Sequence, residues 1–230
     1  MAPAPAPAPA PVTSAGPDHA TSDDVALDRA LFVAILRAAY SGELAAALAY
    51  RGHWRSLWRA HRSDVRAEIR RIEAEEWHHR REVGKVLAEM GSGPQRWREV
   101  AMWSVGRFFG SLCFVGGWFG PIYAAGRLEG ANVGQYEQAA VHARRAGLDH
   151  YLPGLALMTA TEDRHERWFG NLIAQHPLLP LTSRLLGWRP PPPLDQTDPE
   201  GGLSDRRPDD LDGAGATADP AEEQRPDPSR

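Results

Sequence analysis

Two copies of one pattern of Glu and His constrain the fold of this chain more than any other feature. The copies are Glu43 with Glu76-x-x-His79 and Glu129 with Glu162-x-x-His165. The lone Glu precedes its Glu-x-x-His motif by 33 residues in both copies (76 − 43 and 162 − 129). Residues three apart lie on one face of an α-helix. The pattern therefore predicts four helices that bring four carboxylates and two imidazoles to one interior point.

The predicted ligands lie within apolar stripes, where a charged side chain needs an explanation. Glu43 is the only charged residue between Ala38 and Tyr50. A buried carboxylate without a cation is costly. In the last helical stretch, apolar residues and the Glu-x-x-His motif recur together at spacings of three and four: Leu155, Met158, Glu162, His165, Phe169 and Leu172. Both placements favour a bound metal over a solvated acidic face.

The second helical stretch offers more than one Glu and His, so its ligands have to be chosen. Glu75-x-x-His78 is a frame-shifted neighbour of the Glu76-x-x-His79 motif. An apolar stripe decides between them, and its members are Ile69, Ile72, Val83, Val86 and Leu87. Glu76 and His79 lie in line with this stripe, whereas His78 is turned aside. We therefore predict Glu76 and His79 as the ligands.

This donor set predicts two iron ions, with manganese as a possible substitute. Hard carboxylate oxygens suit such ions, whereas structural zinc prefers four Cys or His ligands. The set is that of di-iron and di-manganese centres in ferritin-like bundles, so the predicted fold is an all-α, ferritin-like four-helix bundle. Tyr50 and Tyr136 each lie seven residues after a lone Glu, and two roles stay open for them: orienting that carboxylate, or filling space in the core.

Hydrophobic periodicity and turn residues predict four bundle helices, over about 24–60, 63–90, 121–146 and 151–175. On the first, Leu27, Leu31 and Leu36 are expected on the buried side. An additional apolar segment rich in Trp and Gly runs from Trp97 to Tyr123, between the second and third bundle helices. Its glycines, Arg107 and Pro121 argue against a simple membrane span, which leaves an interfacial position or a core helix with its linker.

Composition divides the chain into three parts. Residues 1–24 contain an Ala-Pro repeat and residues 190–230 are an acidic, Pro-rich tail, and both are expected to be disordered around a single domain at 25–189. That domain holds 22 Lys and Arg against 16 Asp and Glu, or +6, while the tail holds 4 against 11, or −7. A basic domain favours an anionic membrane surface, although a solvated helix surface fits equally well.

Two features bear on location. The one cysteine, Cys113, excludes an intrachain disulfide and favours a reducing compartment. The N-terminus lacks the basic and continuous apolar regions of a signal peptide. We expect a cytoplasmic protein, peripheral on the inner face of the cell membrane. The remaining histidines fit no ligand spacing and are expected to be surface or packing residues: His53, His61, His142, His150 and His176.

The motifs resemble those of the demethoxyubiquinone hydroxylase family over about residues 27–173. The resemblance includes Gly42-Glu43 with Tyr50, Glu76-x-x-His79 followed by Val83, Leu87 and Met90, the Trp- and Gly-rich stretch from Trp103 to Gly126, Glu129 with Tyr136, and Glu162-x-x-His165. It implies a membrane-peripheral di-iron monooxygenase that acts on a ubiquinone precursor. The chain departs from the family at Ala39 and Tyr40, where members usually have Asp-His, and at Gln135, where they often have His.

Three functions follow from these patterns. The leading hypothesis is a monooxygenase that hydroxylates a lipid-soluble, quinone-like ring with O2, using electrons from a partner or from NADH. The alternative is iron oxidation or peroxide removal in the manner of ferritins and rubrerythrins, although no rubredoxin-like Cys-x-x-Cys module is present. The third is a membrane-surface scaffold that has lost its metal, which the complete set of six ligands disfavours. We expect no nucleic-acid partner, and a homo-oligomer is compatible with the sequence.

Overall fold

The computed structural model describes residues 21–59 and 63–192. In these ranges the chain is all-helical and contains no strand, which confirms the predicted class. The elements are α1 (Ser22–Ser56), η1 (Leu57–Arg59), α2 (Ser63–Glu89), α3 (Arg96–Leu112), α4 (Phe119–Arg145), η2 (Asp149–Tyr151), α5 (Leu152–Ile173) and α6 (Leu179–Leu186). Sequence analysis did not distinguish α6. Most of the two ends expected to be disordered lies outside the described residues.

α1 begins three residues before the boundary expected at residue 25. Thr21 caps it in a reciprocal capping box: the Asp24 backbone N–H donates to Thr21 Oγ1 at 3.2 Å, and the Thr21 N–H donates to Asp24 Oδ2 at 3.0 Å. Such a box satisfies two of the backbone N–H groups that a helix start leaves without partners. Residues 22–24 therefore belong to α1 rather than to the Pro-rich segment before it.

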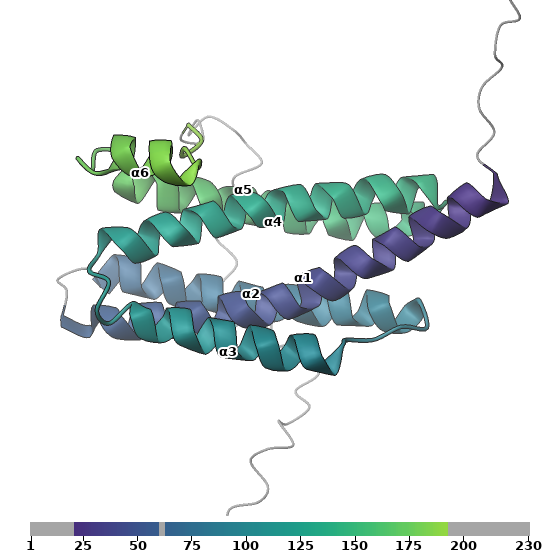
Figure 1. Cartoon of the computed structure of the whole chain (residues 1–230), viewed down its shortest axis with the longest axis horizontal. Coiled ribbons are helices and arrows are strands. Elements are labelled where there is room, and N and C mark those ends of the chain that lie inside the picture. The colour runs from purple at the N-terminus through teal and green to yellow at the C-terminus, as the bar shows by residue number, and fades with distance from the viewer. Residues whose placement is uncertain (1–20, 60–62, 193–230) are drawn as a thin grey trace, which may run out of the picture. The chain divides into compact units, whose positions relative to one another are not determined.

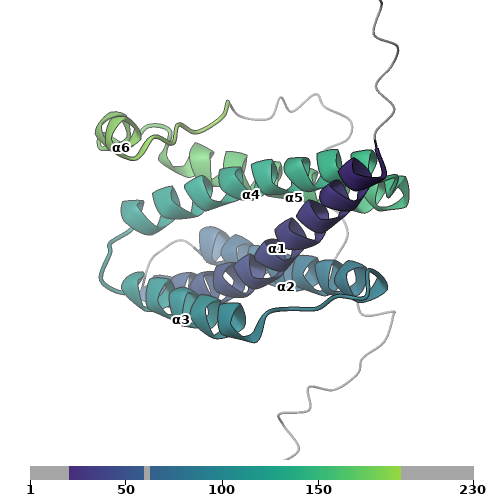
Figure 2. The same ribbon diagram turned by 45° about the vertical axis from the view of Figure 1, so that its right-hand side comes forward.

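The helices of residues 21–192 form two groups, which Figures 1 and 2 show as two layers. α1 packs against both α2 and α3, and α4 packs along α5. α1 also contacts α4 and so joins the two groups. After α6 the chain folds back, and Trp188 packs edge-on against Tyr123 of α4 with 5.1 Å between ring centroids. The space between the four long helices α1, α2, α4 and α5 holds the predicted ligands.

Two apolar clusters form the core. One contains Ile69, Ile72 and Phe169, and the other contains Leu36, Val83 and Leu87. The predicted stripes on α2 and α5 are thus buried, with Val86 and Leu172 only partly so. The prediction for the start of α1 was wrong: Leu27 and Leu31 are 59% and 39% exposed. The inward side there runs through the half-buried Asp28 and the buried Phe32, one position later and about 100° around the helix.

The Trp- and Gly-rich segment forms α3, a turn and the first residues of α4. α3 ends at Leu112, and α4 begins at Phe119 rather than after Pro121. Gly117, in the turn between them, has φ 68°, a conformation that side chains disfavour. One face of α3 packs on α1. The solvent-exposed side chains of α3 are largely apolar, and we define its outer face by Trp97, Val100, Trp103 and Phe108.

α3 lies close to α1 because glycines meet at their contact. A Cβ built on Gly52 would lie 2.3 Å from the Gly110 Cα, and one built on Gly106 would lie 2.5 Å from the Ala45 backbone oxygen. Only residues without a Cβ allow two backbones to approach this closely.

α1 is long and apolar enough to span a bilayer, judged by length and composition alone. It is the one such helix among the described residues, and 44% of its apolar stretch is buried inside the protein.

We predict that Gly52→Ala destabilises the protein by about 1–3 kcal/mol, the usual cost of overpacking, because the added methyl meets the Gly110 backbone. Gly134→Ala is the matched control, since a Cβ on Gly134 of α4 meets nothing within 4 Å. That control should be neutral or stabilise by up to about 1 kcal/mol through helix propensity. Urea unfolding followed by circular dichroism measures both changes. If both variants unfold at the same midpoint urea concentration, the close packing of α3 on α1 is contradicted.

Candidate metal centre

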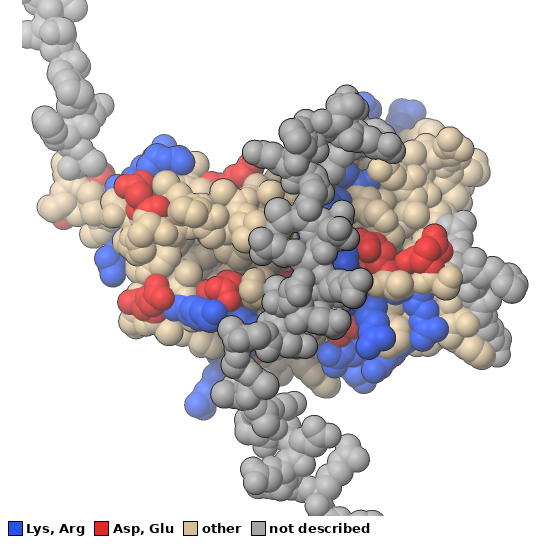
Figure 3. Space-filling model, turned by 180° about the vertical axis from the view of Figure 1, so that it is seen from behind, with Lys and Arg blue, Asp and Glu red and all other residues tan. Residues whose placement is uncertain are grey.

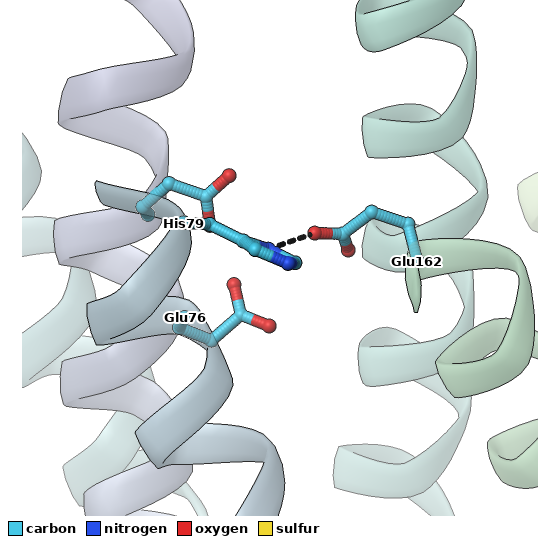
Figure 4. A group of neighbouring side chains, drawn as sticks. Glu76, His79 and Glu162 are labelled. Carbon is cyan, nitrogen blue, oxygen red and sulfur yellow. Dashed lines mark ion pairs between the residues drawn. The ribbon is translucent and has the colours of Figure 1, made fainter. Parts of the chain in front are cut away.

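The structure brings all six predicted ligands together. Glu43 comes from α1, Glu76 and His79 from α2, Glu129 from α4, and Glu162 and His165 from α5. Each of these residues is at most 3% exposed. Figure 4 shows Glu76 and His79 on one helix pointing toward Glu162 on another. Helical spacing of three places Glu and His of each motif on the same inward face, as the sequence predicted.

The ligands fall into two overlapping sets. One set is Glu43, Glu76, His79 and Glu162, and the other is Glu76, Glu129, Glu162 and His165. Within each set the potential ligand atoms lie within 4.8 Å of one another. Glu76 and Glu162 belong to both sets, and a carboxylate has two oxygens with which to bind two neighbouring ions. Each set could therefore hold a metal ion, with the Glu of each Glu-x-x-His motif common to both sets.

Many inward-facing atoms of the cluster lack hydrogen-bond partners within the described part of the chain. They are Glu43 Oε2, both carboxylate oxygens of Glu76, Glu129 Oε2 and His165 Nδ1, together with His79 Nδ1 and Glu162 Oε1, which face each other as an ion pair without hydrogen-bond geometry. Among the contacts between them, His79 Nδ1 lies 2.8 Å from Glu162 Oε1, and His165 Nδ1 lies 3.6 Å from Glu76 Oε1. Buried polar atoms normally have partners, and buried charges are paired or bind metals. These residues can hold metal ions.

Two tyrosines donate hydrogen bonds to the cluster, and each bonds to the lone Glu of the other copy of the Glu and His pattern. The Tyr136 hydroxyl donates to Glu43 Oε1, and the Tyr50 hydroxyl donates to Glu129 Oε1. Each Tyr had been considered as a partner for the Glu of its own half, but seven residues along a helix span about 10 Å. The observed pairs fit antiparallel packing of α1 and α4, because both pairs of numbers have the same sum (43 + 136 and 50 + 129).

His165 has a partner that sequence analysis set aside. His165 Nε2 lies 2.6 Å from Glu75 Oε2, while His165 Nδ1 faces the cluster. Glu75 is itself held by Arg71 and by Arg164, whose Nη2 is 3.3 Å from Glu75 Oε1. Carboxylates in this position fix the tautomer and orientation of a metal-binding His. Glu75, from the frame-shifted Glu-x-x-His motif on α2, is thus the outer hydrogen-bond partner of His165 on α5. The contact depends on how the two helices pack, so the sequence alone does not show it.

The cluster has another outer contact, and the remaining histidines lie apart from it. Asn132 Nδ2 donates to Glu162 Oε2 at 3.3 Å. His53 is buried, and burial lowers its pKa to about 4. His142 Nδ1 lies 2.6 Å from Asp28 Oδ1, which joins α4 to the start of α1. These two histidines have the packing role that was expected, and His61 lies outside the described residues.

Without metal, the cluster favours protonated carboxyl groups. Burial and then the charge of Glu162 raise the pKa of both Glu76 and Glu129 well above the usual value. Burial alone would also raise the pKa of Glu162, but its contacts with Glu129 and His79 lower that pKa to about 2. Burial lowers the pKa of His79, but Glu162 more than offsets this and the net shift is upward. Four adjacent carboxylates cannot all be charged unless cations accompany them.

No family model matches the chain, and no curated protein or solved structure is significantly similar to it. The geometry of this cluster and the motifs of the sequence are therefore what bear on function.

We predict that the metal-free protein loses stability as pH rises from about 5 to 8. Glu76, Glu129 and His79 have raised pKa values in the fold, so each contributes stability below its unfolded pKa and loses it as pH rises through the folded pKa. Thermal unfolding across this pH range, with and without a divalent metal, measures the effect. Stability that increases toward pH 8 without metal would contradict the shifts, and metal should abolish the decline.

We predict that Glu75→Gln weakens metal binding about 10- to 100-fold, the usual effect of losing a ligand's outer partner. In the wild type, Glu75 favours the tautomer of His165 that carries its proton on Nε2, which leaves Nδ1 unprotonated and able to bind a metal. The neutral amide of Gln favours this tautomer less. Glu82→Gln is the matched control, because Glu82 is on the same helix but pairs with Lys85 at the surface. Isothermal titration with Co²⁺ measures both variants. Equal affinities would show that the contact between His165 and Glu75 has no role in binding.

Proposed function

We propose that α1, α2, α4 and α5 form a ferritin-like four-helix bundle around two iron ions. On this proposal the protein is a monooxygenase that hydroxylates a quinone-like ring. The observation that carries it is the sharing of Glu76 and Glu162 between two sets of buried ligands. Sharing of this kind is the arrangement by which paired carboxylates bridge two ions in such bundles.

The donor set supports iron over zinc. Four carboxylates and two imidazoles offer the hard oxygen donors that suit iron or manganese. A zinc site usually has three or four protein ligands, with Cys or His prominent in structural sites. When bound, a pair of ferrous ions would supply the electrons and the binding site for O2. Manganese tolerates the same ligands and remains the alternative metal.

The chain's own residues would hold and isolate this centre. Glu43 and His79 would bind one ion, Glu129 and His165 the other, and Glu76 and Glu162 both. The hydroxyls of Tyr50 and Tyr136 fix one oxygen each of Glu129 and Glu43, which leaves the other oxygen free for metal. Apolar clusters contain residues on both sides of the ligands along α2, Ile69 and Ile72 before them and Val83 and Leu87 after them. Such packing excludes bulk water from the ligands.

The outer face of α3 supports a substrate that comes from a membrane. Trp97, Val100, Trp103 and Phe108 are each more than half exposed. Soluble proteins rarely expose apolar surface of this kind without a partner, and Trp suits the boundary between lipid and water. We propose that the protein lies on the inner face of the cell membrane and takes a lipid-soluble, quinone-like substrate there. One atom of O2 would enter the ring C–H bond as a hydroxyl, and the other would leave as water after taking two protons from solvent and two electrons from a partner or NADH.

If the proposed metal centre is correct, substituting a ligand shared by both sets should remove more iron than substituting a ligand of one set. Protein produced in iron-replete cells should contain about two irons per chain, as expected for such bundles. Glu76→Ala should lose both ions because Glu76 belongs to both ligand sets. His165→Ala should lose the ion at its own set first and retain part of the iron. Iron analysis with circular dichroism as a check on folding measures this, and iron-free wild type that is well folded would sink the proposal.

The oxygenase part is tested with isotopically labelled oxygen. Reduced protein, ¹⁸O2 and a ubiquinone precursor that lacks one ring oxygen should yield a product with one ¹⁸O atom, detected by mass spectrometry. Glu162→Ala should abolish the product, and Glu82→Gln should not. Oxidation of added ferrous iron or consumption of peroxide, without any hydroxylated product, would instead favour the ferritin-like alternative.

A further inference from the structure

Trp54, near the end of α1, is fixed by a buried carboxylate outside the metal cluster. Glu73 is 7% exposed and accepts a hydrogen bond from the Trp54 indole N–H at 2.6 Å. The other Glu73 oxygen accepts from Arg51 Nε at 2.7 Å and from the Trp77 indole at 3.4 Å. Glu73 thus neutralises Arg51 and holds the Trp54 ring in one orientation.

Three further arginines gather around this ring. The guanidinium carbons of Arg55, Arg66 and Arg70 lie 5.2, 5.5 and 5.7 Å from the Trp54 ring centroid. Each side chain is exposed, and within the described ranges none of the three pairs with a carboxylate. Glu73 and Glu68 pair with Arg51 and Arg71 instead, and the exposed Asp64 at the start of α2 forms no ion pair with the three arginines within the described ranges. The ring attracts the three cations through its face but neutralises none of them, so the guanidinium groups keep their N–H donors for another anion.

This arginine cluster, defined as Arg55, Arg66 and Arg70 around Trp54, lies beside exposed apolar residues. The end of α1, the start of α2 and the turn between α3 and α4 lie at the same end of the two layers (Figures 1 and 2). Trp58 is 60% exposed there, and Phe114 and Val115 in the turn are 57% and 80% exposed. Figure 3, from behind, shows Lys and Arg gathered at the lower right, over the side where α2 begins.

We propose that the arginine cluster binds the phosphate groups of anionic lipids. Guanidinium groups bind phosphate through paired N–H donors, and basic residues beside apolar ones are attracted to anionic bilayers. Single-stranded nucleic acid stacks on aromatic rings such as Trp58 but offers no partner to the exposed aliphatic Val115, whereas a bilayer accepts apolar residues of both kinds and supplies the phosphates together. This inference rests on the membrane contact of the proposed function and adds the class of lipid that is recognised.

The test compares two triple variants of the full chain. Arg55→Gln, Arg66→Gln and Arg70→Gln together remove the cluster. The control replaces Arg81, Arg144 and Arg145 with Gln, which removes the same charge from exposed positions near the ends of α2 and α4. Cosedimentation with vesicles of phosphatidylcholine alone, or with one third phosphatidylglycerol, measures binding. On the anionic vesicles the cluster variant should bind about 100-fold more weakly and the control close to wild type.

The outcomes separate this inference from the proposed function. Binding of wild type to neither kind of vesicle would overturn the membrane contact itself. Equal weakening by the two triple variants, or equal binding of wild type to neutral and anionic vesicles, would overturn the arginine cluster alone. Glycerophosphoglycerol at millimolar concentration should not displace the protein from anionic vesicles, and displacement would point to a free phosphate ligand. If the cluster variant loses binding to single-stranded DNA while its binding to vesicles is unchanged, the proposal that the arginine cluster binds anionic lipids would also be overturned.

Discussion

Four carboxylates held together in an apolar interior repel one another, and the rest of the structure has to accommodate this. Glu43, Glu76, Glu129 and Glu162 are each at most 2% exposed, and several of their oxygens lack a hydrogen-bond partner within the described part of the chain. The free-energy cost of burying four adjacent carboxylates, from desolvation and mutual repulsion, is offset only by protons or by cations. Two cations would balance the charge and engage the orphaned atoms of both Glu and His, whereas each proton neutralises one carboxylate and supplies a single hydrogen bond.

The outer contacts of the cluster show how the bundle positions it. Tyr50 and Tyr136 bond across α1 and α4, so each lone Glu is fixed by the opposite half of the pattern. The two histidines differ, because the contact with Glu75 gives His165 an ionised outer partner. The two proposed metal positions are therefore related by the repeated pattern but are unequal in their surroundings.

Helical spacing made the ligands predictable, because positions three apart share a face whatever the helix packs against. Glu76 and His79 could be chosen over Glu75 and His78 for the same reason, since the apolar stripe of α2 marks its inward side. Glu75 and the crossed tyrosine bonds could not be predicted, because they depend on how α2 meets α5 and α1 meets α4. Leu27 and Leu31 were misplaced because apolar residues occur on both sides of the first turns of α1, where few neighbours cover it.

The most direct test of the account is a crystal structure of the iron-loaded protein with diffraction data collected at the iron absorption edge. The account predicts two anomalous peaks, both adjacent to Glu76 and Glu162, one beside Glu43 and His79 and the other beside Glu129 and His165. No peak among these six side chains in iron-replete crystals, or a single peak that leaves one ligand set unused, would contradict it.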